Sequence, residues 1–191
     1  MNRLYSVLLG ILITTSAVAA ELPQGPHTVA KYPATEPTSW ARFCAKYKGE
    51  CDTPDDSAYQ VKLTEDKMAV IQRINQRVNA EITYVLDQEH WKQDDQYDLP
   101  TDGKGDCEDI ALQKRHLLIK AGFPARALLL TIVLWRGDGH AILTVVTDRG
   151  DLMLDNYTNR IKTFDDNPFK MVQRQDPNWL GRWKRFEEWR P

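Results

Sequence analysis

The chain has 191 residues, of which 42% are hydrophobic and 27% are charged, so it can form one domain with a real core and is neither disordered nor a long coiled coil. The formal net charge at pH 7 is −2, and the acidic residues are scattered rather than gathered in a tail. No basic excess favours a nucleic-acid partner.

The first twenty residues have the pattern of a secretory signal. Arg3 precedes an apolar run over residues 7–13, and small residues follow up to Ala20. The run is short for a bilayer-spanning helix, although an N-terminal membrane anchor is the alternative interpretation. No later segment has a transmembrane pattern. We therefore expect a signal peptide over 1–20, a domain over 21–191, and export to a bacterial periplasm without stable membrane insertion.

Residues 21–105 are predicted to contain two helices, an extended segment and a loop. Residues 64–85 have apolar residues at steps of three and four, and Thr64 is a suitable N-cap. The apolar positions are Met68, Ile71, Ile74, Val78, Ile82 and Val85. The other predicted segments are an extended lead-in over 21–39, a short helix over 40–47 and a polar loop over 87–105.

A helix followed by strands is predicted next. The helix covers residues 107–121 and is closed by Gly122 and Pro124. The period then changes to that of strands, which we expect over 125–135, 140–147, 151–155 and 161–164. The tail contains Trp179, Trp183 and Trp189, whose spacing favours packing over a ligand cage. The order predicts an α+β fold with a helix packed on one face of an antiparallel sheet.

The three cysteines divide into a close pair and an odd one. Cys44 and Cys51 could form a disulfide across a short loop in an oxidising compartment. Cys107 is then a pairing site, a functional thiol or a buried inert thiol. The sequence contains neither Cys-x-x-Cys nor His-x-x-x-His, which disfavours zinc.

Cys107 lies at the start of the predicted helix, with acidic residues on both sides. Asp106 is well placed as N-cap, and Glu108 and Asp109 fall in the first turn, so capping and helix-dipole compensation explain part of the pattern. The same position can serve catalysis, because a helix N-terminus stabilises a thiolate and its N–H groups can hold an oxyanion. The preceding Gly-Lys-Gly loop allows close approach of another backbone.

His140 is the best candidate for the base, because it begins a strand whose end can meet the tip of a helix. His116 lies inside a helix, and His27 and His90 lie in segments without a clear periodic pattern. A lone histidine is more often structural, so the sequence position alone does not establish the role.

Asp155 is a candidate to orient the imidazole. A tight turn at 149–150 would pair Asp155 with Thr144, four residues from His140 and about 13 Å along the strand. Contact would then need a bulge, a bend or another register. Asp138, Asn156 and Asn159 are alternative orienting residues.

The blocks GKGDCEDIALQK, GHAILTV and LDN, in this order, resemble the bacterial transglutaminase-like cysteine proteinases, the family of LapG-type periplasmic proteases. The resemblance covers roughly residues 64–165, with weaker support from residues 40–51. It implies a papain/transglutaminase-like fold with Cys107 as nucleophile, His140 as general base and Asp155 as orienting acid.

The resemblance also implies that Asp106 and Glu108 bind Ca²⁺, which activity requires in LapG-type enzymes. Calcium prefers carboxylate and carbonyl oxygens, and a bound dication would offset the negative charge beside the thiolate. The loop over 98–105 could add ligands, with Asp102 as a candidate, although it does not follow the EF-hand pattern. Plain helix capping is the alternative.

For function, the resemblance implies a periplasmic endopeptidase that cuts a large surface adhesin near its N-terminal anchor, and so regulates biofilm attachment. A membrane receptor that senses cyclic di-GMP is the implied partner, although this chain is short for that group. A transglutaminase or amidase with the same acyl-enzyme chemistry and a non-catalytic calcium-dependent binding module are the alternatives. The second oxyanion donor stays open, with Trp91 and Asn75 as guesses.

Overall fold

The computed structural model describes residues 21–52 and 58–187; the expected signal peptide lies outside them. The helices are α1 (Thr38–Lys46), α2 (Lys48–Cys51), α3 (Glu65–Glu81), α4 (Asp87–His90) and α5 (Cys107–Lys120). The strands are β1 (Tyr32–Ala34), β2 (Thr83–Tyr84), β3 (Lys104–Gly105), β4 (Leu128–Trp135), β5 (Asp138–Thr147), β6 (Gly150–Leu154), β7 (Lys162–Thr163), β8 (Lys170–Asp176) and β9 (Trp179–Arg185).

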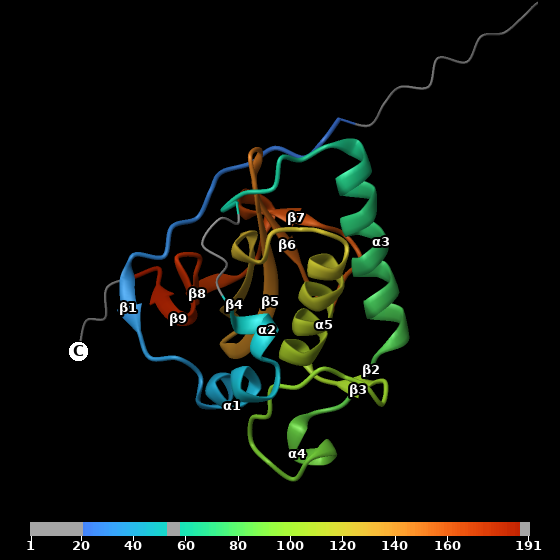
Figure 1. Cartoon of the computed structure of the whole chain (residues 1–191), viewed down its shortest axis with the longest axis vertical. Helices are drawn as coiled ribbons and strands as arrows, with labels where there is room; N and C mark the ends of the chain where they lie inside the picture. The colour runs from blue at the N-terminus through green and yellow to red at the C-terminus, as the bar shows by residue number, and fades with distance from the viewer. Residues whose placement is uncertain (1–20, 53–57, 188–191) are drawn as a thin grey trace, which may run out of the picture.

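Seven of these strands form one antiparallel sheet in the order β1-β9-β8-β4-β5-β6-β7. Helix α5 lies across the middle of this sheet, with α3 beside it and α1 and α2 near one end (Figure 1). This arrangement confirms the predicted α+β class, with a helix packed on an antiparallel sheet.

The main core lies between α5 and the sheet. Alternate residues of β4 and β5 face the helix, and each large aliphatic side chain buried here contributes about 1.5–3 kcal/mol. The core residues of these three elements are Ala111, Leu112, Leu118, Leu128, Leu130, Ala141, Leu143 and Val145. A smaller cluster around Val133, Ile142 and Met153 occupies the other face of the sheet. The fold thereby fixes α5 against β5, the strand that begins close to its first turn.

Helix α3 is shorter than the sequence pattern predicts. It begins after Thr64, whose hydroxyl accepts a hydrogen bond from the N–H of Lys67 at 3.3 Å, but it ends at Glu81 rather than Val85. The following residues instead pair in parallel with β3. The β-branched and aromatic content of residues 82–85 suits extended backbone, so the two apolar positions that extend the helical period, Ile82 and Val85, flank β2 instead of continuing the helix. The predicted loop over 87–105 likewise contains α4 and β3.

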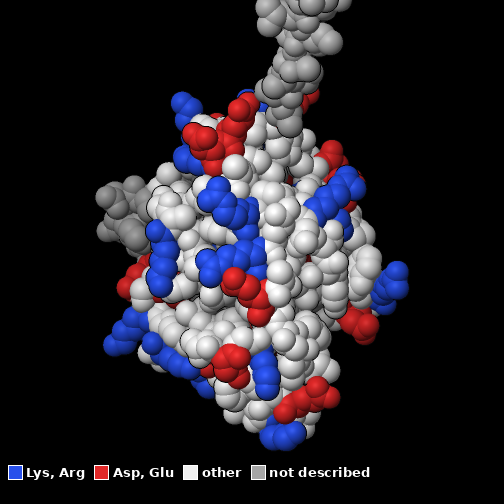
Figure 2. All heavy atoms as spheres, turned by 90° about the vertical axis from the view of Figure 1, so that its right-hand side faces the viewer, with Lys and Arg blue, Asp and Glu red and all other residues white. Residues whose placement is uncertain are grey.

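The outward side of α3 carries charges of both signs. Figure 2 views the molecule from this side and shows blue Lys and Arg side chains beside red Asp and Glu side chains. Arg77 and Glu81, one helical turn apart and largely exposed, form an ion pair of 2.9 Å on this helix. Residues of α3 that face the body of the protein include the fully buried Ile71 and Asn75.

The C-terminal strands β8 and β9 were not predicted. Trp183 on β9 is buried against Trp40 of α1, with ring centroids 5.9 Å apart, which confirms a packing role. Trp179 is exposed and lies against Arg182. Trp189 lies outside the described residues. The lead-in also contributes an edge strand, since β1 pairs with β9.

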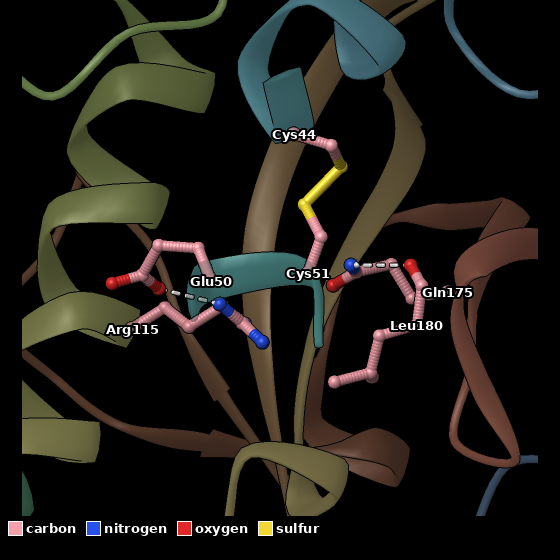
Figure 3. Close-up of a disulfide and its surroundings, with 6 residues drawn as sticks. All are labelled: Cys44, Glu50, Cys51, Arg115, Gln175 and Leu180. Carbon is pink, nitrogen blue, oxygen red and sulfur yellow. Dashed lines mark hydrogen bonds and ion pairs between the residues drawn. A yellow bond between two sulfur atoms is a disulfide. The ribbon is translucent and has the colours of Figure 1, made fainter. Parts of the chain in front are cut away.

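A disulfide joins Cys44 of α1 to Cys51 at the end of α2 (Figure 3). It therefore closes the loop that carries Glu50, whose carboxylate accepts a hydrogen bond from Arg115 of α5. Within the described residues, no helix is both long and apolar enough to cross a membrane.

Replacing both Cys44 and Cys51 with serine is expected to lower the free energy of unfolding by about 2 kcal/mol, because the cross-link restricts the unfolded chain over a short loop. Urea denaturation of the double variant and of the wild type measures the difference. Wild type in a strong reductant should show a similar loss, and an unchanged midpoint in both experiments contradicts the prediction.

Candidate active site

The thiol of Cys107 lies between the first turn of α5 and the start of β5. It is half-buried, its Sγ accepts a hydrogen bond from the N–H of Ala141 at 3.4 Å, and it donates to Glu108 Oε2 at 3.2 Å. Burial and the negative charges of Glu108 and Asp106 raise the pKa of Cys107 well above its usual range, against the smaller lowering by Ala141. These effects favour the protonated thiol over the thiolate.

His140 and Asp155 form a buried pair beside this thiol. His140 Nε2 lies 2.9 Å from Asp155 Oδ1, and the two residues are 4% and 2% exposed. Burial alone would raise the pKa of Asp155, but hydrogen bonds from His140 and from the N–H of Tyr157 lower it. The ring of Tyr157 stacks on His140 with centroids 4.7 Å apart. These contacts keep Asp155 anionic and leave His140 Nδ1 as the ring nitrogen that can accept a proton.

The expected pairing of Asp155 with Thr144 is wrong by two residues. The observed register pairs Thr147 with Gly150 and Thr144 with Met153, so Asp155 follows β6 at the level of Ile142. Ile142 and His140 are two residues apart and share a face of the strand. Asp155 is thus a diagonal neighbour of His140, about 7–8 Å away between backbones and within reach of an imidazole without a bulge.

Cys107 and His140 line one pocket of ≈ 240 Å³. The other lining residues are Asp95, Tyr97, Glu108, Ile132, Gly139 and Ala141. The structure therefore brings the three residues of the expected triad to one place, from α5, β5 and the residue after β6. Of the candidate orienting residues, Asp155 is the one that hydrogen-bonds His140.

Five carboxylates surround the start of α5, belonging to Asp87, Asp95, Asp106, Glu108 and Asp109. Their oxygens approach one another within 4.8 Å in overlapping groups of three, one group including the Cys107 thiol. Asp106 occupies the N-cap position, but its side chain does not cap the helix. One buried oxygen on Asp106 and one on Asp87 have no hydrogen-bond partner among the described residues.

Burial, reinforced by the mutual repulsion of these acids, raises the pKa of Glu108 to about 10, of Asp109 to about 8 and of Asp87 to about 6. Such buried carboxyl groups are ionised at neutral pH only when a positive charge compensates them. A cluster made of oxygen donors, two of them unsatisfied, fits a hard cation such as Ca²⁺.

The cluster differs from the expected ligand set. Asp106 and Glu108 belong to it, as expected, whereas Asp102 does not: its carboxylate contacts His90 at 2.8 Å. The carboxylate of Asp98 accepts hydrogen bonds from Lys46 and Tyr47. Asp87 and Asp95 were missed, because they lie in a polar segment where acidic residues are common and carry no spacing signal.

The two guesses for a second oxyanion donor are not supported. The side-chain amide of Asn75 is fully buried and donates to the carbonyl oxygen of Asn159 at 3.2 Å. Trp91 is 40% exposed and packs on His90. Neither residue lines the pocket that contains Cys107.

Lys114 of α5 gives a prediction for stability against pH. Burial lowers its pKa from 10.5 to about 7, against the smaller attraction of Asp155. Between these pH values the unfolded chain holds a proton that the folded chain has released, so this residue makes the free energy of unfolding rise with pH. Lys114→Met should therefore flatten the rise between about pH 7 and 9 in urea denaturation; parallel curves for variant and wild type contradict this.

Comparison with known proteins gives a family and a set of similar structures. A family model described as bacterial transglutaminase-like cysteine proteinase BTLCP matches residues 30–190. A calcium-bound structure of Legionella pneumophila LapG is 25% identical with a TM-score of 0.51, covering 62% of this chain and 68% of that chain.

Two further LapG structures are similar. One is 25% identical with a TM-score of 0.50, covering 62% of this chain and 66% of that chain. The EGTA-treated form is 26% identical with a TM-score of 0.49, covering 61% of this chain and 65% of that chain. These two matches thus cover slightly less than two thirds of the LapG chain. No curated protein matches this sequence.

Proposed function

Because the chain belongs to the bacterial transglutaminase-like cysteine proteinase family, whose members are cysteine peptidases, we propose that it is an endopeptidase with a Cys107–His140–Asp155 triad. The observation that carries the proposal is the buried 2.9 Å contact between His140 and Asp155, beside a cysteine at a helix N-terminus. The geometry gives each residue a distinct role.

In the proposed reaction, Cys107 transfers its proton to His140 Nδ1 while Sγ attacks the carbonyl carbon of the scissile peptide bond. His140 then passes the proton to the leaving amine as the C–N bond breaks, which leaves a thioester on Cys107. A water molecule, deprotonated by His140, then attacks the carbonyl carbon of the thioester; the C–S bond breaks, the carboxylic acid product leaves, and His140 returns the proton to Cys107 Sγ. Asp155 holds the imidazole and stabilises its protonated form, and the N–H of Cys107 at the start of α5 can stabilise the oxyanion.

We also propose that the enzyme requires Ca²⁺, held by Asp106 and Glu108 together with Asp87, with Asp95 and Asp109 close by. The all-oxygen donor set and the unpartnered oxygens of Asp87 and Asp106 support this proposal, as does the existence of a calcium-bound LapG structure. A bound dication would supply positive charge that offsets the carboxylates beside the Cys107 thiolate.

The sequence and the family also support proposals for the export and the substrate of the protein. We propose a signal peptide over residues 1–20, a mature periplasmic domain over 21–191, and cleavage of a large adhesin near its N-terminal anchor, with a cyclic di-GMP-sensing receptor as regulator. The signal-like pattern supports the location, and the resemblance to LapG-type proteases supports substrate and receptor. A transglutaminase would differ only in using an amine as acyl acceptor, so adding an amine and looking for its incorporation separates the two activities.

The decisive test is cleavage of a purified adhesin N-terminal fragment by residues 21–191, with calcium and with a chelator. We expect cleavage to stop in Cys107→Ala and on chelation, and to return when calcium is restored. Asp106→Asn should raise the calcium concentration needed for half-maximal activity by about tenfold or more, because an ionised ligand is lost. Asp102→Asn is the matched control, since Asp102 lies outside the cluster, and should leave this concentration unchanged.

Cleavage that survives chelation would return the acids to a purely structural role. Absence of cleavage by the wild type, together with a Cys107 that does not react with a thiol probe, would contradict the enzymatic proposal itself.

A further inference from the structure

Residues 155–159, the loop that begins with Asp155, accept hydrogen bonds from a row of amide side chains on α3. Gln72, Asn75 and Asn79 are spaced three and four residues apart, which places them along one side of the helix. Gln72 and Asn75 donate to the carbonyl oxygen of Asn159 at 2.9 and 3.2 Å. Asn79 donates to the carbonyl of Thr158 at 3.2 Å. The loop is therefore attached to a regular helix at more than one point.

The carbonyl oxygen of Asp155 receives two donors from two different helices. Asn79 Nδ2 of α3 and Lys114 Nζ of α5 each donate to it at 3.0 Å. A carbonyl oxygen has two lone pairs, so both are used and its direction is set by α3 and α5 together. The carboxylate of Asp155 accepts a hydrogen bond from His140. The hydrogen bonds to the backbone of Asp155 therefore also affect the position of the imidazole.

A buried position on α5 is usually occupied by an apolar side chain, and Lys114 departs from this rule. It is 0% exposed, and in the described part of the chain its hydrogen-bond partner is a main-chain carbonyl rather than a carboxylate. Burying an amine costs free energy that an apolar side chain would not. The presence of a lysine is therefore explained by its hydrogen bond to the carbonyl oxygen of Asp155. Both the charged and the neutral amine can donate this hydrogen bond.

Lys114 also lies on the helix that begins with the nucleophile. Seven residues, about two helical turns, separate it from Cys107, so both project from the same side of α5. The same helix therefore positions the thiol at its first residue and, two turns later, donates a hydrogen bond to the backbone of Asp155.

We propose that Lys114 and Asn79 are positioning residues: they fix the main chain of Asp155, and through it the orientation of His140 relative to Cys107. This inference rests on the proposed triad, and neither residue contacts the pocket that contains the thiol. A small displacement of an orienting group is sufficient to lower the rate of the chemical step, whereas substrate binding is unaffected.

The test compares Asn79→Asp and Lys114→Met with Gln72→Glu in the exported, signal-processed chain, using a peptide substrate. Asn79→Asp keeps the size of the side chain but turns a donor into an anion facing the carbonyls of Asp155 and Thr158. We expect kcat to fall by about 10- to 100-fold in both variants, with KM changed less than about twofold. Gln72→Glu makes the same chemical change where only Asn159 is contacted, and should keep kcat within about twofold of wild type.

A spectroscopic readout separates positioning from general destabilisation. The proton on His140 Nε2 that is hydrogen-bonded to Asp155 should give a resolved NMR signal in wild type and Gln72→Glu, and a shifted or exchange-broadened one in Asn79→Asp. Unchanged kcat and an unchanged signal in folded Asn79→Asp would overturn the inference. If Lys114→Met fails to fold, Asn79→Asp and Asn79→Ala decide the question, because Asn79 is only half-buried.

Asp155→Asn, assayed in parallel, distinguishes the two levels of the argument. If it is inactive while Asn79→Asp and Lys114→Met are fully active, the positioning role is wrong and the triad stands. If it is fully active, the triad is wrong, and the positioning role fails with it.

Discussion

Asp155→Asn is expected to lower kcat by about 10³- to 10⁴-fold with little change in KM. The carboxylate accepts a hydrogen bond from His140 Nε2, which places the imidazole proton on that nitrogen and leaves Nδ1 free to accept the proton of Cys107. An asparagine amide can donate to Nε2 instead, which favours the tautomer with its proton on Nδ1. The base is then blocked although the side chain has kept its size.

Asp138→Asn is the matched control. Asp138 lies at the exposed start of β5, two residues from His140, and was an alternative orienting residue in the sequence. It should leave kcat within about twofold of wild type, since it makes the same chemical change away from the imidazole. Steady-state kinetics on both variants measures the difference, and equal losses in the two would exclude a specific role for Asp155.

Glu50→Ala should destabilise the fold by about 3–5 kcal/mol, because it leaves a buried guanidinium without its counterion. Arg115 is 0% exposed and donates through Nη1 to Glu50 Oε2 at 2.6 Å. Burial lowers the pKa of Arg115 to about 10, and the charge of Glu50 opposes this. His116 contacts the other oxygen of the same carboxylate, so the substitution removes a partner from two residues of α5.

The exposed pair of Arg77 and Glu81 supplies the comparison. Its two side chains are 61% and 57% exposed, and Glu81→Ala should cost no more than about 0.5 kcal/mol. Urea denaturation of the two variants in the same buffer gives both values. A similar small loss for each would mean that Arg115 acquires another partner or access to water when Glu50 is removed.

The fold and the site were predictable to different extents. Helix α5 and the strands β4 to β6 were recognisable because caps, apolar period and turn residues agree along the chain. The strands β8 and β9 were not, because sequences such as Lys170–Asp176 alternate weakly and gain their stability from pairing with β4 and with each other. The pairing of β8 with β4 joins residues more than thirty positions apart, such as Arg174 and Thr131.

The register of Asp155 was mispredicted for a similar reason. The sequence pattern places Gly150 in the tight turn, which would shift the pairing of the hairpin by two residues from the observed register. Gly150 has φ 112°, and a Cβ there would lie 2.1 Å from the carbonyl oxygen of Gly25. The glycine is therefore required by the approach of the N-terminal segment, whose Gly25 N–H also donates to the carbonyl of Arg149. A contact between residues so far apart leaves no local signal.

The acid cluster was half predictable. Asp106 and Glu108 were visible beside Cys107, but Asp87 and Asp95 join them only because α4 and the loop that follows it lie against the start of α5. Lys114 and Asn79 were likewise within predicted helices, and it is the fold that directs both to one carbonyl.

The Cys44–Cys51 disulfide makes dithiothreitol an ambiguous reagent for this protein. The reductant keeps Cys107 from accumulating as a sulfenic acid or a mixed disulfide, and it also opens the link between α1 and α2. Activity lost at a high concentration of reductant therefore indicates reduction of the Cys44–Cys51 disulfide. Activity lost at a low concentration of reductant indicates oxidation of Cys107. In an oxidising environment Cys44 and Cys51 are already paired, so Cys107 is the cysteine of the described residues that an oxidant can still modify.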